Sequence, residues 1–412
     1  MQETKLPSNS QYVIVTVDRP VMFQQTEDEA WVLNPNRRYL INASRIPAIH
    51  QFVESVSELE NGSLYNPLRP GKSVTGAKIL VERFRERGIG DLLFLTGPLS
   101  YLYHISGANL QIDLFAFSDR GTVLTHAPFL HNQTVCCGPL EYDHLRMYNY
   151  HWLVGSVTEC DEEADQLNVY DALFRQIGCE PSAIDARWKR PAATLVSEDY
   201  QHLDALLKWT FNKTKTVDLR RLPYYVVAPF SNASLRSAPY SLWFKLIRQL
   251  SQRRPVVVVG TSTMRLPDTD MSAGQFIQGV ENFGGGVINL VDRTPSARLL
   301  MALVARAKAV VCLDSAPLYL AQATGTPAIS LWGSHDPGAR IGYDERYMRY
   351  ALWNQQSCNC APCYAYSQFP ANKCPDGQRQ KTCECLASLT EEQVLKTMDA
   401  LEMDTSPTGL KK

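Results

Sequence analysis

The sequence predicts an α/β protein built from parallel sheets with helices on both faces. The clearest stretch runs from 307 to 333. There, Val310 to Leu313 form an apolar run that stops at Asp314, Pro317 opens a periodic segment, and Gly325 breaks it before a second apolar run. Fully apolar strands that alternate with helices are typical of parallel sheets buried on both faces, and ligands of such sheets bind beyond the carboxyl ends of the strands.

Length and charge limit the class of protein. The 412 residues are enough for two or three domains, and 41 Lys and Arg residues almost balance 42 Asp and Glu residues. Nucleic acid is therefore not indicated as a partner, although a near-neutral net charge does not exclude it, because a local basic patch is enough to bind it. The first residues show no signal-peptide pattern, and the apolar runs are too short for a transmembrane segment. We expect a cytoplasmic protein.

Residues 1–75 differ from the rest of the chain and predict a small accessory α+β module. Short β-like runs occur at 12–17, 30–33 and 38–42, and Ser44 is placed to cap a helix through Ile49, Phe52 and Val56. The segment carries no catalytic pattern. It is read either as a recognition module or as a packing extension, and we favour packing.

The next region opens with a strand at 78–84. Gly88 and Gly90 precede Asp91, and a helix is expected from 92 to 105. A carboxylate on a rigid turn at the edge of a sheet is suited to take a proton from an incoming hydroxyl, so Asp91 is a candidate general base. The alternative is a plain helix N-cap.

The last region restarts the alternation of strands and helices. Strands are expected at 224–228, 256–260, 286–290 and 310–313, and helices at 241–251 and 296–307. The turn Asp314-Ser315-Ala316-Pro317 offers small residues and the free N–H groups of a helix start, which attract phosphate. We read it as a diphosphate cradle, and the alternative is an ordinary turn of the fold.

Six of the 11 cysteines crowd between Cys358 and Cys385. In a reducing compartment, such clustering favours a metal site over disulfides. The alternative is a group of free or disulfide-paired thiols.

Three motifs in 78–402 resemble the family 9 glycosyltransferases, whose best-known members are heptosyltransferases of lipopolysaccharide. The family's glycine-aspartate motif corresponds to Gly90-Asp91, and its proline-glycine-alanine-serine loop, which carries a lysine and a tryptophan-proline pair, corresponds in length to 229–239. Its aspartate-threonine-glycine-proline signature corresponds to 314–321. The resemblance implies the GT-B architecture, in which two Rossmann-like domains face a cleft.

The resemblance also implies roles for individual residues. Asp91 would be the catalytic base and Arg236 would replace the family's phosphate-binding lysine. The predicted donor-binding residues are Ser231, Asn232, Arg236, Asp314, Ser315, Ala316, Pro317 and Tyr319, and the acceptor loop contains Gly88 and Gly90. Phe230, Asn232, Ala238 and Tyr319 depart from the family's motifs, so the donor's sugar and base stay open, whereas arginine can still grip two phosphate oxygens.

Many members of the family carry a cysteine-rich segment before the final helix. Tetrahedral zinc needs four thiolates, and the preferred ligands here are Cys360, Cys363, Cys374 and either Cys383 or Cys385. This zinc would be structural, and no cofactor is required for transfer itself.

The pattern of the sequence and the family resemblance together predict four segments of the chain. These are a module at 1–75, an acceptor domain at 76–220, a nucleotide-sugar domain at 221–345, and a Cys-rich segment with a closing helix at 346–412. The predicted function is inverting hexosyl or heptosyl transfer from a nucleotide-diphosphate sugar to a glycan or another hydroxyl-bearing acceptor. The alternatives are a GT-B epimerase or hydrolase of nucleotide sugars, and a catalytically lapsed binding or scaffold protein.

Overall fold

The computed structural model describes most of the chain. The described residues are 12–26, 29–42, 47, 50–57, 74–83, 88–116, 119–135, 141–145, 147–154, 167–214, 217–231, 234–262, 273–284, 286–341, 343–357, 362 and 383–405. They divide into two compact units. The first lies within Met1–Arg87, Leu102–Gly121 and Pro128–Gly155, and the second within Gly88–Tyr101, Thr122–Ala127 and Ser156–Lys412.

The first unit begins with two small antiparallel sheets. One has the order β4-β1-β5, and the other is a hairpin of β2 and β3. The strands are β1 (Tyr12–Val17), β2 (Val21–Thr26), β3 (Glu29–Leu33), β4 (Tyr39–Asn42) and β5 (Val53–Ser57). Val13, Val15 and Val17 alternate along β1 and are fully buried, so this strand packs one face against the core of the module. The strands predicted in this segment are confirmed.

The helix predicted from Ser44 to Val56 is confirmed at Pro47, but the prediction is wrong from His50 onward. A single turn of 3-10 helix, η2 (His50–Phe52), leads into β5, which pairs with β1 and sets Val56 opposite Val15. Valine favours strands, and pairing with β1 satisfies the backbone of this segment, so the pairing outweighs the helical spacing. Ser44 lies outside the described residues.

A four-stranded parallel sheet completes the first unit. Its order is β8-β7-β6-β9, so the first of these strands in the chain lies between the second and the fourth. The strands are β6 (Lys78–Arg83), β7 (Gln111–Ala116), β8 (Leu130–Val135) and β9 (Tyr150–Leu153), and the short helix α4 (Tyr142–Leu145) precedes β9. The strand predicted at 78–84 is confirmed.

The single helix predicted over 92–105 is divided in two. α2 (Ile89–Phe94) and α3 (Thr96–Ile105) are separated by one residue. Pro98 explains the break, because it has no N–H to donate to the carbonyl of Phe94 and its ring would clash with that carbonyl. α2 therefore ends early, as a short helix of the second unit.

The second unit is organised around a six-stranded parallel sheet. Its order is β12-β11-β10-β13-β14-β15. The strands are β10 (Tyr225–Ala228), β11 (Val256–Val258), β12 (Val287–Asn289), β13 (Ala309–Leu313), β14 (Ala328–Leu331) and β15 (Ala351–Leu352). This is the order of dinucleotide-binding α/β sheets, whose ligands bind where the strand order reverses. The reversal lies between β10 and β13.

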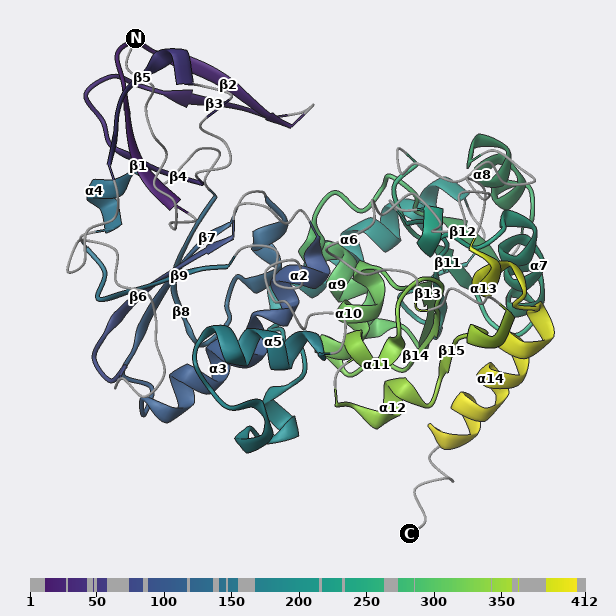
Figure 1. Cartoon of the computed structure of the whole chain (residues 1–412). Helices are drawn as coiled ribbons and strands as arrows, with labels where there is room; N and C mark the ends of the chain where they lie inside the picture. Colours follow the sequence, from purple (N-terminus) through teal and green to yellow (C-terminus); the bar gives the residue numbers. More distant parts are fainter. Residues whose placement is uncertain are drawn as a thin grey trace. The chain divides into compact units, whose positions relative to one another are not determined.

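Helices connect and cover these strands. The further α-helices of this unit are α5 (Val169–Gln176), α6 (Ser197–Thr214), α7 (Tyr240–Ser251), α8 (Ala273–Glu281), α9 (Ala297–Arg306), α10 (Ala316–Thr324), α11 (Pro337–Arg340), α12 (Glu345–Met348), α13 (Glu384–Ala387) and α14 (Glu391–Asp404). The 3-10 helices after η2 are η3 (Asp119–Leu124), η4 (Pro181–Ala183), η5 (Ala186–Trp188), η6 (Ser234–Arg236) and η7 (Gln355–Ser357). On one face of β10, Tyr225 and Val227 share a core with α7, α8 and α14. Figure 1 labels these three helices.

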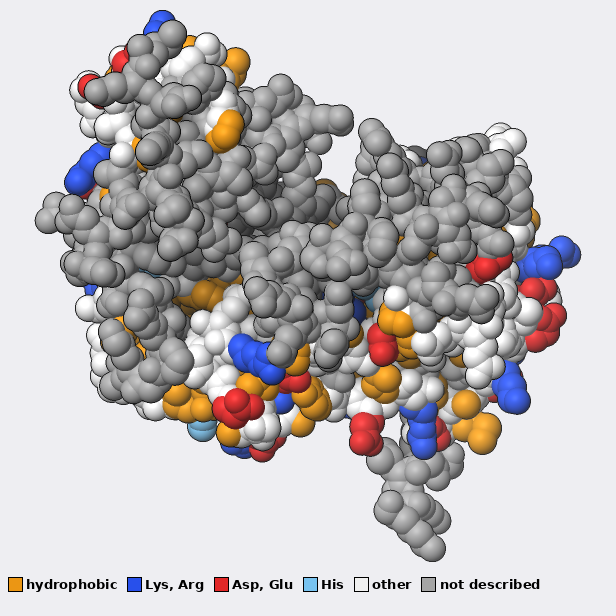
Figure 2. Space-filling model, viewed as in Figure 1, with side chains coloured by type: hydrophobic (Ala, Val, Ile, Leu, Met, Phe, Trp, Pro, Cys, Tyr) orange, Lys and Arg blue, Asp and Glu red, His pale blue; other side chains and the backbone are white. Residues whose placement is uncertain are grey.

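Charged side chains of the second unit are mixed in sign. Figure 2 shows blue and red side chains next to one another on its visible face. Three ion pairs that involve α14 are Lys245–Glu391, Arg253–Asp399 and Arg349–Asp404. Within the part of the chain that the structure describes, no helix has the length and apolar character needed to cross a membrane.

Candidate functional site

Two predicted site residues meet where the strand order reverses. Asp314 directly follows β13, and Arg236 lies in η6, in the loop that leaves β10. Nη1 of Arg236 donates a hydrogen bond of 3.3 Å to the backbone oxygen of Asp314 and lies 3.8 Å from the carboxylate oxygen Oδ2. The side chain of Arg236 is 30% exposed. The guanidinium therefore contacts the turn, while the Arg236 side chain as a whole stays partly accessible to solvent.

The carboxylate of Asp314 is buried among polar side chains. Nδ1 of His335 lies 2.9 Å from Oδ2, and the hydroxyl of Tyr319 donates a hydrogen bond to Oδ1. Burial alone would raise the pKa of this carboxyl, but the hydrogen bond with His335 and the charges of Arg236 and Arg340 outweigh it. The pKa of Asp314 is therefore held well below its usual value. The ionised carboxylate orients the groups around it.

Two basic residues of this site, His335 and Arg340, were not among the predicted residues. His335 follows β14, Arg340 ends α11, and both are buried. Burial lowers the pKa of His335 to about 4 despite the neighbouring carboxylate, so the imidazole is neutral at pH 7. The sequence did carry a signal, because His335 closely follows the apolar run that ends at Trp332. Ligand-binding residues are expected at such a strand end.

The segment from Asp314 to Pro317 forms the start of α10. Ser315 is the N-cap residue, but its hydroxyl donates to the carbonyl oxygen of Leu313 over 3.3 Å and does not cap the helix. The first amide groups of the helix, such as that of Ala316, and the positive end of its dipole are the features that attract phosphate. The turn thus has the backbone that a diphosphate cradle requires, and its binding of a diphosphate stays a prediction.

The remaining predicted donor residues differ in their surroundings. Ser231 is buried just after β10. Tyr319 is only 5% exposed, and its hydroxyl is engaged with Asp314 inside the protein. Asn232 lies outside the described residues.

Asp91 lies on the first turn of α2. Gly88 is the N-cap residue, and a Cβ there would overlap the carboxylate of Asp91, so this carboxylate folds back over the start of its own helix. A Cβ on Gly90 would lie 2.6 Å from the ring of Tyr319, so only glycine lets α2 approach α10 this closely. The helix of Asp91 therefore packs against the helix that starts at the Asp314 turn. The role of Asp91 as a base stays a prediction.

The structure describes two of the predicted metal ligands. Cys383 and Cys385 are buried free thiols, and a hydrogen bond with Cys385 lowers the pKa of Cys383 to about 7 against the opposing effect of burial. Cys360, Cys363 and Cys374 lie outside the described residues. Among those that are described, no three His, Cys, Asp or Glu side chains form a group able to hold a metal. The zinc site stays a prediction.

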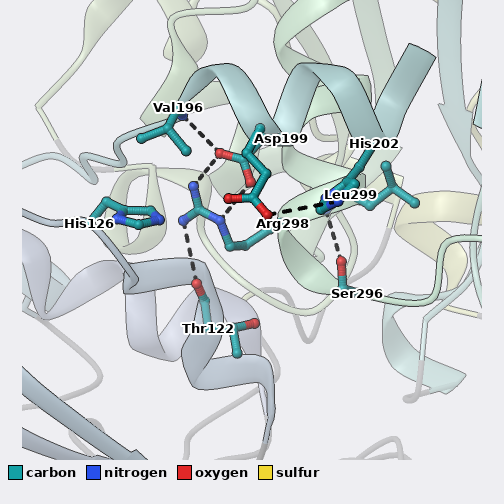
Figure 3. A pocket seen from close by; sticks show the side chains of 9 residues that line it. Thr122, His126, Val196, Asp199, His202, Ser296, Arg298 and Leu299 are labelled. Atoms are coloured by element: carbon teal, nitrogen blue, oxygen red, sulfur yellow. Dashed lines mark hydrogen bonds and ion pairs between the residues drawn. The ribbon is translucent and has the colours of Figure 1, made fainter. Parts of the chain in front are cut away.

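A second polar site of this unit is a pocket of about 270 Å³ at the starts of α6 and α9 (Figure 3). Nε of Arg298 donates to Oδ1 of Asp199 over 2.7 Å, and the two side chains are 12% and 7% exposed. Arg298 also donates to the backbone oxygens of Thr125 and Thr194, over 2.7 and 3.0 Å. Because these bonds tie separate segments of the chain together, we assign Arg298 a structural role.

Comparison with known proteins identifies the family of the segment that carries Arg236 and Asp314. Residues 189–368 match the family model described as glycosyltransferase family 9 (heptosyltransferase). This segment belongs to glycosyltransferase family 9. It contains β10 to β15, so both residues of the reversal point lie inside the family 9 domain. The chain is a glycosyltransferase of the class that uses nucleotide sugars.

Solved structures of family 9 glycosyltransferases share the fold. ADP-heptose lps heptosyltransferase II from E. coli is 14% identical, with 79% of this chain and 99% of that chain covered and a TM-score of 0.57. A glycosyl transferase family 9 protein from Veillonella parvula is 13% identical, with 81% and 99% covered and a TM-score of 0.57. The predicted GT-B architecture is confirmed by these two structures.

The similarity to a third protein extends further along the chain. The iron-containing dodecameric glycosyltransferase TibC from enterotoxigenic E. coli is 13% identical, with 97% of this chain and 93% of that chain covered and a TM-score of 0.56. TibC has also been solved in complex with ADP-D-beta-D-heptose. No curated protein matches this sequence.

Proposed function

We propose that the chain transfers a heptosyl or hexosyl group from a nucleotide-diphosphate sugar to an acceptor hydroxyl, with inversion at the anomeric carbon. The observation that carries the proposal is the contact between Arg236 and Asp314 at the reversal point of a sheet with dinucleotide-binding strand order. The family match supports a nucleotide-sugar donor. The TibC complex favours ADP-heptose as the first donor to test.

In this proposal the diphosphate of the donor lies at the start of α10. The amide groups of Ser315 and Ala316 and the helix dipole attract the phosphates. The guanidinium of Arg236, oriented by Asp314, binds phosphate oxygens and stabilises the negative charge that builds on the leaving diphosphate. Ser231 and Asn232 belong to the loop that carries Arg236.

Asp91 is the proposed general base. Its carboxylate takes the proton of the acceptor hydroxyl while the oxygen attacks the anomeric carbon, and the bond from that carbon to the diphosphate oxygen breaks. The nucleoside diphosphate leaves with the electron pair of that bond. A half-buried carboxylate on α2, which packs on α10, is consistent with this role. Gly88 and Gly90 are the proposed acceptor-loop residues.

We keep the four predicted segments as the functional division of the chain. Residues 76–220 bind the acceptor and 221–345 bind the donor, while 1–75 form an accessory module. The Cys-rich segment, 346–412, closes the chain with α14.

We also propose a structural metal ion in that last segment. Two neighbouring buried thiols, one with a lowered pKa, fit a metal site, because metals bind the thiolate form. Cys383 or Cys385 would act together with Cys360, Cys363 and Cys374. Zinc is the expected ion, and elemental analysis compares it with iron, which TibC contains.

Product analysis tests the proposed reaction. The protein is incubated with ADP-heptose alone and with oligosaccharide or polypeptide acceptors, and ADP release and product masses are measured. Transfer predicts acceptor-dependent ADP release, and inversion predicts an α-linked product from the β-configured donor. ADP release that no acceptor increases would indicate a hydrolase, and conversion of the donor into an isomer of the same mass without ADP release would indicate an epimerase. Tight donor binding without ADP release would indicate a lapsed transferase.

A further inference from the structure

Tyr319 touches both parts of the proposed active site. Its hydroxyl donates to Oδ1 of Asp314 at the proposed donor turn. Its ring lies against Gly90, the residue before Asp91, and meets the ring of Phe94 edge-to-face, with centroids 4.7 Å apart and an interplanar angle of 71°. All of these residues belong to the second unit. A side chain that is 5% exposed and held at these three places has little freedom to move.

We propose that Tyr319 is a positioning residue that links the helix of Asp91 to the donor-binding turn at Asp314. The inference rests on the proposed function, because that function assigns the base to one end of the contact and the donor to the other. Tyr319 then acts through the residues it touches and not through contact with the donor.

The link is mechanical, because the tyrosine ring is rigid. A shift of α2 toward α10 presses Gly90 against the ring and moves the hydroxyl relative to Asp314. Asp314 in turn accepts the hydrogen bond of Arg236 through its backbone oxygen. A displacement at the acceptor side therefore reaches the guanidinium that is proposed to bind the diphosphate.

The substitution Gly90→Ala tests this link from the side of α2. The added Cβ would lie 2.6 Å from the ring of Tyr319, so the ring must shift. We expect the Kd for ADP to rise about five-fold, within the range typical of coupled neighbours. Tyr319→Phe keeps the ring and removes the hydroxyl, and we expect a similar rise. The matched control is Gly274→Ala on α8, where a Cβ meets no described atom within 4 Å and ADP binding should not change.

The double variant Gly90→Ala/Tyr319→Phe shows whether the two substitutions weaken ADP binding through one shared contact or independently. If the ring transmits the shift through its hydroxyl, then Gly90→Ala in the Tyr319→Phe background should change the Kd for ADP by less than about two-fold. Calorimetry gives the Kd values. Urea unfolding of wild type, the two single variants Gly90→Ala and Tyr319→Phe, and the double variant gives the stability of each. Independent, multiplicative losses of ADP affinity would overturn the proposal. So would unchanged ADP affinity together with coupled losses of stability, because Tyr319 would then be a packing residue only.

A second variant keeps the proposal testable if Gly90→Ala does not fold. Phe94→Leu keeps an apolar side chain and removes the edge-to-face contact with Tyr319, and it should couple to Tyr319→Phe in ADP binding in the same way. Wild-type protein that binds neither ADP nor ADP-heptose would refute the proposed function and this inference together. Wild-type binding with uncoupled variants would refute the inference alone.

Discussion

Arg236 donates a hydrogen bond to the backbone oxygen of Asp314, although the two residues lie 78 positions apart in the chain. The contact forms because β10 and β13 are adjacent parallel strands, with Ala228 paired to Cys312, and both connecting loops leave at the same edge of the sheet. A cation and the start of a helix are thereby held together, which is the arrangement that a diphosphate requires.

Removing the proposed base should abolish transfer and leave donor binding intact. Asp91→Asn keeps the size of the side chain but cannot take a proton, so we expect the transfer rate to fall by at least about 100-fold while the Kd for ADP changes less than about two-fold. Initial rates and calorimetry measure the two effects. Asp185→Asn makes the same chemical change at the N-cap of η5, where asparagine also caps, and should keep the wild-type rate. Wild-type turnover by Asp91→Asn would refute the assignment.

The buried ion pair of Figure 3 should be important for stability. Arg298→Ala leaves Asp199 as an unpaired buried charge, and we expect a loss of about 3–5 kcal/mol in the free energy of unfolding. Arg187, whose side chain is 60% exposed and pairs with Asp185 at 3.7 Å, is the control, because Arg187→Ala should cost less than about 1 kcal/mol. Urea denaturation measures both. Equal losses would contradict the structural role of Arg298.

Stability should decline in a pH range set by His335. Its pKa is about 4 in the folded protein and 6.5 when exposed, so the unfolded state binds the proton first as pH falls. The stabilisation is fully present above pH 6.5 and is lost between 6.5 and 4, at about 1.4 kcal/mol for each unit of the pKa difference. Asp314, whose pKa is also lowered, adds its own loss only at lower pH, as pH falls below its exposed value of 3.8.

Substitution shows whether His335, and not another histidine, causes the pH dependence of stability. Urea denaturation at several pH values should show a shallower decline for His335→Gln than for wild type. His202, whose side chain is 67% exposed, is the control, and His202→Gln should keep the wild-type decline. A wild-type pH dependence in His335→Gln would show that this imidazole is not the titrating group.

The cysteine segment should contain a metal ion. Elemental analysis of the purified protein should find about one zinc ion per chain, as expected for a tetrahedral thiolate site. Cys383→Ser should lower the metal content and the Tm together, whereas Cys179→Ser, at a half-buried thiol elsewhere in the unit, should keep the metal. Iron in place of zinc would correct the identity of the ion. A metal-free wild-type protein would contradict the site itself.

Local sequence patterns were enough to predict five of the six strands of the larger sheet, whereas the two-residue strand β15 was not predicted. Apolar runs such as 310–313 stop at a polar residue, and strand ends of this kind marked Asp314 correctly as a residue of the sheet's carboxyl edge. The loop after β10 was placed by its resemblance to a family motif. That Arg236 bonds to Asp314 follows only from the adjacency of β10 and β13, which pairs residues distant in the chain.

Other features depended on tertiary contacts that no local pattern contains. His335 and Arg340 became site residues because β14 brings their loop beside Asp314. The segment through Val56 has helical spacing, but pairing with β1 makes it a strand. Pro98 was visible in the sequence, and its effect on the carbonyl of Phe94 would have predicted the break between α2 and α3.

The donor diphosphate is proposed to bind where Arg236 meets Asp314, and calorimetric titration with ADP measures this binding. We expect wild type to bind ADP and Arg236→Ala to bind it about 10- to 100-fold more weakly, because a charge-assisted contact to phosphate is lost. Arg254→Ala, at a cation 36% exposed and 3.5 Å from Glu402, should bind like wild type. Equal ADP affinity of wild type and Arg236→Ala would show that the diphosphate does not bind at Arg236.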